Sequence, residues 1–231
     1  MLGPLFEAFA ELNVATERVV YEDDSIDDVR AQLIGLDGVL VWVNPIQDGA
    51  NRRLLDGLLR DVSSRGVWVS AHPDVIARMG TKEVLFHTRS LGWGTDTDLY
   101  QSPRDLAERL PDRLRRDRRV VVKQARGTAG NGVWRIDLAG SAIDSSAIAA
   151  ADTLVRVVQA NTPDRAAEEV SLVAFIDHLT AYFDWSGSLV VQPYQSRLAE
   201  GMIRCYLAQD QVVGFCHQYR FPLWSERSSG F

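Results

Sequence analysis

Cysteine is scarce in this sequence of 231 residues, which contains only Cys205 and Cys216. Two cysteines are too few for a disulfide framework, and their spacing does not match a zinc knuckle. We therefore expect a reducing compartment, of which the cytoplasm is the simplest. No apolar run reaches the roughly 18 residues that a transmembrane helix needs. Residues 1–10 lack the basic start of a signal peptide, so neither a membrane partner nor a signal sequence is predicted.

Positive charge is not in excess either. The net charge is −6 and the pI is near 5.2, which argues against a nucleic-acid partner. This balance still permits a small anionic ligand in a local basic pocket. The four histidines show no H-x-x-x-H spacing, and Ser90 and Ser186 have no nucleophile-elbow context. We therefore predict no metal site built from histidine and no protein nucleophile.

The first part of the chain alternates apolar runs with an amphipathic segment. Residues 38–43 are a continuous apolar run, which predicts a buried parallel strand, and residues 52–64 carry the leucine stripe of a helix. Residues 67–70 predict a second strand, and a shorter one is expected at residues 19–21. Strand, helix and strand in this order form a βαβ unit, so residues 1–78 are predicted to be a small N-terminal domain.

Helix and strand signals continue through the rest of the chain. Ser102 and Pro103 predict the start of a helix that runs to about Leu114. The basic run at residues 113–119 is expected to be the solvated end of that helix, with nucleic-acid contact as the alternative. Further expected elements are strands at 154–159 and 189–194, a helix at 166–182, and a hairpin of 202–208 with 211–217.

A glycine-rich stretch in the middle of the chain has the pattern of strand, loop and strand. Three valines lead into Lys123, a loop with three glycines follows, and a segment beginning at Val133 resumes the apolar alternation. The loop is not a P-loop, because Val133 and Trp134 stand where that motif has Lys and Ser or Thr. Glycine lets backbone N–H groups approach an anion closely. The stretch therefore predicts a clamp for nucleotide phosphates, or else an ordinary glycine-rich β-turn.

Three pieces of the sequence occur in an order that resembles the ATP-grasp superfamily. They are Lys82 after the βαβ segment, Lys123 with the glycine hairpin, and the strand pair Val-Val-Gln-Pro-Tyr (190–194) and Gly-Met-Ile-Arg (201–204). The resemblance covers nearly the whole chain. It implies an α/β fold in which a βαβ pre-domain precedes an ATP-grasp-like α+β domain, divided into residues 79–188 with the hairpin and residues 189–231.

The resemblance also implies roles for particular residues. Lys82 and Lys123 would bind the α- and β-phosphates of ATP, and Arg204 would act in catalysis at the γ-phosphate or an acylphosphate. Gln192, Pro193 and Tyr194 would line the adenine. The mobile lid over the phosphates would be formed by Gly127, Thr128, Gly130 and Gly132.

The implied activity is ATP-dependent activation of a small-molecule carboxylate as an acylphosphate, which an amine or a thiol then attacks. Members of the superfamily bind Mg²⁺ through acidic residues and an E-x-N pair on late strands. After Tyr219 this chain has Glu226 but no E-x-N, so the Mg²⁺ ligands are not found. We expect a truncated chain, or a non-catalytic nucleotide-binding or interaction module. An α/β protein of another class is the third reading if the glycine loop is only a turn.

Overall fold

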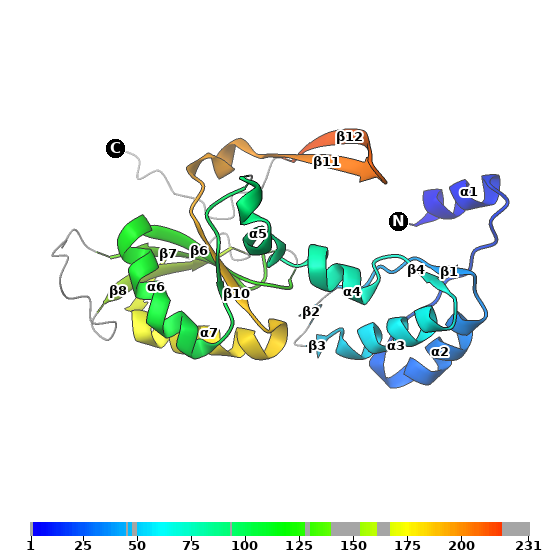
Figure 1. The fold of residues 1–231 in the computed structure, drawn as a ribbon, viewed down its shortest axis with the longest axis horizontal. Coiled ribbons are helices and arrows are strands. Elements are labelled where there is room, and N and C mark those ends of the chain that lie inside the picture. Colours follow the sequence, from blue (N-terminus) through cyan, green and yellow to red (C-terminus); the bar gives the residue numbers. More distant parts are fainter. Residues whose placement is uncertain are drawn as a thin grey trace. The chain divides into compact units, whose positions relative to one another are not determined.

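The structure is a computed structural model that describes residues 2–44, 46–47, 50–92, 94–127, 130–139, 153–160 and 167–218 (Figure 1). The chain divides into two compact units. Unit 1 comprises residues 1–43 and 52–76, and unit 2 comprises residues 44–51 and 77–231. Each unit has its own hydrophobic core.

Unit 1 contains the predicted βαβ arrangement. Strand β1 (Gly38–Val39) pairs in parallel with β4 (Trp68–Val69), and helix α3 (Arg53–Ser64) connects them. The leucine stripe of α3 packs against α2 (Ile26–Ile34), because an amphipathic helix must bury its apolar face. The core residues of this unit are Val29, Leu33, Leu55, Leu58, Leu59, Val62, Val67 and Val69.

Two strand predictions in unit 1 need correction. The apolar run at residues 38–43 gives a strand of only two residues, and Leu40 and Trp42 are 43% and 72% exposed. Side chains alternate between the two faces of an extended segment, and only one face of this run lies on the core. Residues 19–21 form no strand, since no described segment pairs with them.

The main body of unit 2 is a six-stranded antiparallel sheet with the order β5-β10-β6-β7-β8-β9. Strands β6 and β7 are the predicted hairpin on either side of the glycine loop, and β10 lies beside β6. The bounds are β5 (Asp98–Tyr100), β6 (Arg119–Gln124), β7 (Val133–Leu138), β8 (Leu154–Gln159), β9 (Glu168–Ser171) and β10 (Leu189–Pro193).

Two helices, α6 (Pro103–Asp117) and α7 (Leu172–Ser186), cover one face of this sheet (Figure 1). Each begins at a serine whose hydroxyl accepts a backbone N–H of the first turn: Ser102 caps α6 and Ser171 caps α7. The predicted helix at 166–182 was wrong at its start. Glu168–Ser171 pairs with β8 as an edge strand, and the serine cap then starts the helix.

Strand alternation sorts the side chains of the sheet into two sets. Val120, Val122, Leu189 and Val191 belong to the core under α6 and α7. The intervening residues of β6 and β10 must point to the opposite face, and these include Lys123 and Gln192. The sheet therefore separates an apolar, helix-covered face from a face that bears the predicted polar residues.

The remaining elements are short. The predicted hairpin is confirmed as β11 (Met202–Ala208) with β12 (Gln211–Gln218), which form a two-stranded sheet. No helix within the described ranges is both long and apolar enough to cross a membrane. The other elements are α1 (Gly3–Glu11), η1 (Asp23–Ser25), β2 (Ile46–Gln47), β3 (Ala50–Asn51), α4 (Pro73–Val75), the π-helical turn η2 (Ile76–Gly80), α5 (Val84–His87), η3 (Arg89–Leu91) and η4 (Ser196–Glu200).

Candidate functional site

Lys82 and Lys123 are the only lysines in the sequence, and every other residue counted as Lys or Arg is an arginine. Unit 2 brings the two together. The backbone N–H of Lys82 donates to the carbonyl oxygen of Ala125 at 3.0 Å, two residues beyond Lys123. Burial, and then the positive charge of Lys123, lower the pKa of Lys82 to about 8. The two ammonium groups therefore share one partly buried, electropositive site.

The segment that carries Lys82 is fastened to the ends of two strands. The hydroxyl of Ser188 donates to one carboxylate oxygen of Glu83, and the hydroxyl of Thr81 donates to the other at 3.2 Å. The carbonyl of Ser188 in turn accepts the backbone N–H of Ala125 at 3.1 Å. Glu83 is thus held by hydroxyl groups, and Lys82 is fixed where β6 ends and β10 begins.

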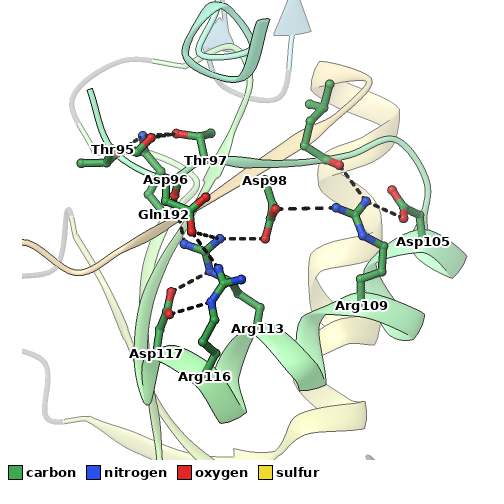
Figure 2. A network of polar contacts seen from close by, with 11 residues as sticks. Thr95, Asp96, Thr97, Asp98, Asp105, Arg109, Arg113, Arg116, Asp117 and Gln192 are labelled. Atoms are coloured by element: carbon green, nitrogen blue, oxygen red, sulfur yellow. Dashed lines mark hydrogen bonds and ion pairs between the residues drawn. The ribbon is translucent and has the colours of Figure 1, made fainter. Parts of the chain in front are cut away.

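Lys123 is held by Gln192 on the neighbouring strand. Lys123 lies opposite Val190 in the register of β6 and β10, so Gln192, two residues further on, shares its face of the sheet. The ammonium Nζ donates to Gln192 Oε1 at 2.7 Å. Gln192 Nε2 donates to the hydroxyls of Thr95 at 2.7 Å and Thr97 at 2.8 Å, as Figure 2 shows for the two threonines. The sequence assigned Gln192 to the adenine edge, whereas in this structure its amide is bonded to Lys123 and the threonines.

Tyr194 follows β10 and lies beside a second group of charged residues. The guanidinium carbons of Arg119 and Arg135 are 5.2 Å and 5.8 Å from the centre of its ring. Asp137 accepts from Arg119 and forms an ion pair with Arg135 at 3.2 Å. Sequence reasoning missed this group. The signal was present in the alternation of β7, because Val133, Arg135 and Asp137 must share the face that carries Lys123.

The glycine loop rests on the side chain of Gln124. A Cβ atom added to Gly127 or Gly132 would lie 2.4 Å from atoms of that side chain, and Gly132 has a φ of +62°. Gln124 is 2% exposed, and its Nε2 donates to the carbonyl of Asn131 at 3.0 Å. Glycine is therefore required here by close packing and by the left-handed backbone. Thr128 lies outside the described residues, and the lid role of the loop stays a prediction.

Arg204 is not brought to the lysine pair by any described contact. It lies on β11 opposite Cys216, and within the described ranges its exposed side chain makes no hydrogen bond or ion pair. Glu200 is the carboxylate residue closest to Arg204 in the sequence. Glu200 instead accepts from Arg197 at 2.8 to 3.0 Å.

The sequence predicted that the basic run at the end of α6 is solvated, but one of its arginines is buried. Arg113 is 3% exposed and donates to the carboxylate of Asp98 and to the carbonyl of Asp96, each at 2.9 Å (Figure 2). Its Nε lies 2.7 Å from Asp117. The reason is helical periodicity: Leu106, Leu110 and Arg113 recur at the spacing of one helix face, and this face is buried.

No fitting site for Mg²⁺ was found in the described part of the chain, where no three side chains of His, Cys, Asp or Glu gather as metal ligands do. The donor set of the site is instead cationic and amide, which suits the oxygens of an anion. The Mg²⁺ ligands that the sequence left unassigned are not identified among these residues.

The helix-covered sheet and the preceding βαβ unit together give a mixed α/β architecture that is consistent with an ATP-grasp-like fold. Among solved structures, the chain is similar to D-cycloserine synthetase DcsG, with a TM-score of 0.54 and 15% sequence identity. The likeness covers 87% of this chain and 56% of that one, so this chain spans about half the length of the synthetase. At this identity the likeness is one of fold. No protein-family model and no curated protein matches the sequence.

Proposed function

We propose that the chain binds ATP on the face of the six-stranded sheet that carries Lys123 and Gln192, with Lys82 beside it, and that it serves an ATP-dependent ligase reaction. The observation that supports this most strongly is that the chain's only two lysines, far apart in sequence, meet beside the glycine hairpin. The likeness in fold to a synthetase points the same way.

The electrostatics of the lysine pair explain why its ligand would be a polyphosphate. Burial, and then repulsion by the like charge of Lys123, lower the pKa of Lys82 to about 8. A triphosphate carries about four negative charges and would turn this repulsion into attraction for both lysines. Backbone N–H groups of the glycine loop can add to the neutralisation, because no Cβ stands in their way.

In the proposed reaction ATP supplies the phosphoryl group that converts a carboxylate into an acylphosphate, and an amine or a thiol then displaces phosphate. Lys82 and Lys123 would bind and orient the phosphate oxygens and stabilise the charge that develops on them. Pro193 and Tyr194 would line the adenine, and Arg204 would meet the transferred phosphate. No side chain of this protein needs to act as a nucleophile. No group of side chains within the described residues fits Mg²⁺.

Thermal unfolding in the presence of Mg-ATP tests the binding half of the proposal. A ligand at 100 times its Kd stabilises the native state by about 2.7 kcal/mol, which raises the Tm by several degrees. We expect this rise in the wild type and a clearly smaller rise in Lys82→Ala and Lys123→Ala. Arg104→Ala is the matched control, because Arg104 is an exposed cation on α6, the helix that covers the other face. An equal rise in wild type and Lys123→Ala would contradict the proposal.

Release of ADP and phosphate tests the ligase half. The protein is incubated with Mg-ATP, a panel of small carboxylates and a panel of amines and thiols. We expect release that needs one carboxylate together with one nucleophile. Binding of ATP with no release under any pair would support the other candidate, a non-catalytic nucleotide-binding module.

A further inference from the structure

The orientation of Lys123 depends on a directional chain of hydrogen bonds that begins outside the lysine site. We propose that Thr95 and Thr97 are positioning residues, which fix the side-chain amide of Gln192 so that its oxygen holds the ammonium of Lys123. This inference rests on the proposed function where it is tested by ATP binding. Where it is tested by the chemical reactivity of Lys123, it needs only the lysine itself.

The hydrogen-bond partners allow only one orientation of the Gln192 amide. The hydroxyl of Thr97 donates its hydrogen to the carbonyl of Thr95 at 2.9 Å, so its oxygen is left as an acceptor for Gln192 Nε2 at 2.8 Å. A lysine ammonium can only donate. The amide oxygen of Gln192 must therefore face Lys123, and the amide nitrogen must face the threonines.

Burial makes any other orientation costly. Thr97 is 1% exposed and Gln192 is 6% exposed, so an amide hydrogen that loses its acceptor cannot turn to water. If the amide rotated by half a turn, its two N–H groups would point at the ammonium of Lys123. Donor would then face donor, and the ammonium would have to move away from its present place. Two hydroxyl groups thereby control the placement of a cation that they do not touch.

The segment that carries the two threonines is itself fixed from the other side. Asp96 lies between them, and its carbonyl accepts from Arg113 Nη2 at 2.9 Å. The carboxylate of Asp98, at the start of β5, accepts from Arg113 Nη1 at 2.9 Å. Figure 2 shows the threonines directed to Gln192 and the aspartates directed to the arginines of α6. The buried Arg113 cluster thus anchors the segment, and the threonines transmit that anchoring to Gln192.

The test uses valine, which has the shape of threonine but no hydroxyl. The variants are Thr97→Val, Thr95→Val and the conservative Thr97→Ser, which keeps the hydroxyl. The matched control is Thr180→Val, because the Thr180 hydroxyl donates to the carbonyl of Ile176 within its own helix α7. Two quantities are measured for each: the Kd for ATP by calorimetry, and the rate at which acetic anhydride acetylates Lys123, relative to the N-terminal amine, by peptide mass spectrometry.

We expect Thr97→Val to weaken ATP binding roughly tenfold, since the site loses part of a hydrogen bond to a charged group. Acetylation of Lys123 should become several-fold faster, because an ammonium that loses an acceptor is more often deprotonated. Thr97→Ser and Thr180→Val should behave like the wild type in both measurements. If Thr97→Val does not fold, Thr95→Val removes one of the two acceptors from a less buried position.

A double-mutant cycle separates an effect through Lys123 from a general loss of packing. If the threonines act through Lys123, adding Thr97→Val to Lys123→Ala changes the Kd for ATP no further. An additive loss, a Thr97→Ser variant as impaired as Thr97→Val, or unchanged acetylation of Lys123 in both valine variants would overturn the inference. Failure of the wild type to bind ATP would instead refute the proposed function, and the acetylation rates would still decide the positioning role.

Discussion

Two clusters of charged residues in unit 2 share the Thr95–Asp98 segment but differ in how their charges are balanced. Arg113 lies among the aspartates 96, 98 and 117, with each charge close to an opposite one. Lys82 and Lys123 lie close to each other, and the pKa of Lys82 is lowered by burial and by that like charge. Opposite charges that pair satisfy one another within the fold, whereas two like charges held close together favour a ligand of the opposite sign.

The largest expected effect comes from removing the cation of the balanced cluster. In Arg113→Met the carbonyl of Asp96 and the three aspartates lose their buried partner and keep only the more exposed Arg109 and Arg116, while the volume of the side chain is largely kept. Breaking a buried ion pair from one side costs about 3 kcal/mol, and we expect the free energy of unfolding of unit 2 to fall by that amount. Urea unfolding followed by tryptophan fluorescence measures the change. Arg104→Ala, on the same helix with a side chain that is 88% exposed, should leave the transition where it was.

Removing a cation from the lysine pair should instead raise the free energy of unfolding. Lys82→Met removes a charge whose folded-state pKa, about 8, lies below the ordinary 10.5. Since the charged form is disfavoured by the fold, its removal should stabilise the protein without ligand by about 1 kcal/mol and weaken ATP binding roughly tenfold or more. Unfolding in urea with and without ATP tests both parts. If Lys82→Met is less stable than the wild type without ligand, the expectation is wrong and Lys82, like Arg113, is a cation that stabilises the fold.

An effect on stability alone is expected at the glycine hairpin beside the pair. In Gly132→Ala the new methyl group meets Gln124 at 2.4 Å on a backbone with a φ of +62°. The combined clash and strain should destabilise the protein by about 2 kcal/mol. Gln124→Ala, added to Gly132→Ala, should recover the part that comes from the clash. Gly57→Ala in α3 is the control, because nothing lies within 4 Å of its added methyl group and alanine favours the helix.

The elements that sequence reasoning predicted well are those whose signal is local. Three consecutive valines and the three glycines indicated the β6–β7 hairpin, and the turn after Ala208 indicated the hairpin of β11 and β12. The start of α7 was misplaced because Glu168–Ser171 favours a helix by composition, while pairing with β8 makes it a strand. That pairing is tertiary and overrides propensity.

The candidate site was only partly predictable for the same reason. Lys82, Lys123 and Gln192 were identified by motif order, but their mutual contacts depend on strand register and on the segment at Thr95. Arg113 was misread because its charged neighbours concealed the helical stripe that buries it. A stronger signal went unused: with lysine present only at 82 and 123, the composition itself marks these two positions.

The scarcity of lysine also allows the most direct test of the central claim, that Lys82 and Lys123 together form an anion site for ATP. Reductive methylation with ¹³C-formaldehyde labels two lysine side chains and the N-terminal amine, so each lysine can be followed by NMR as the pH is raised. Without ligand, Lys82 should titrate with a pKa of about 8, and replacing Lys123 by alanine should raise this pKa. Saturating ATP should shift the resonances of both lysines and raise the pKa of Lys82, because phosphate oxygens favour its charged form. An unshifted pair of lysine resonances at saturating ATP, or an ordinary pKa near 10.5 for Lys82 without ligand, would contradict the account.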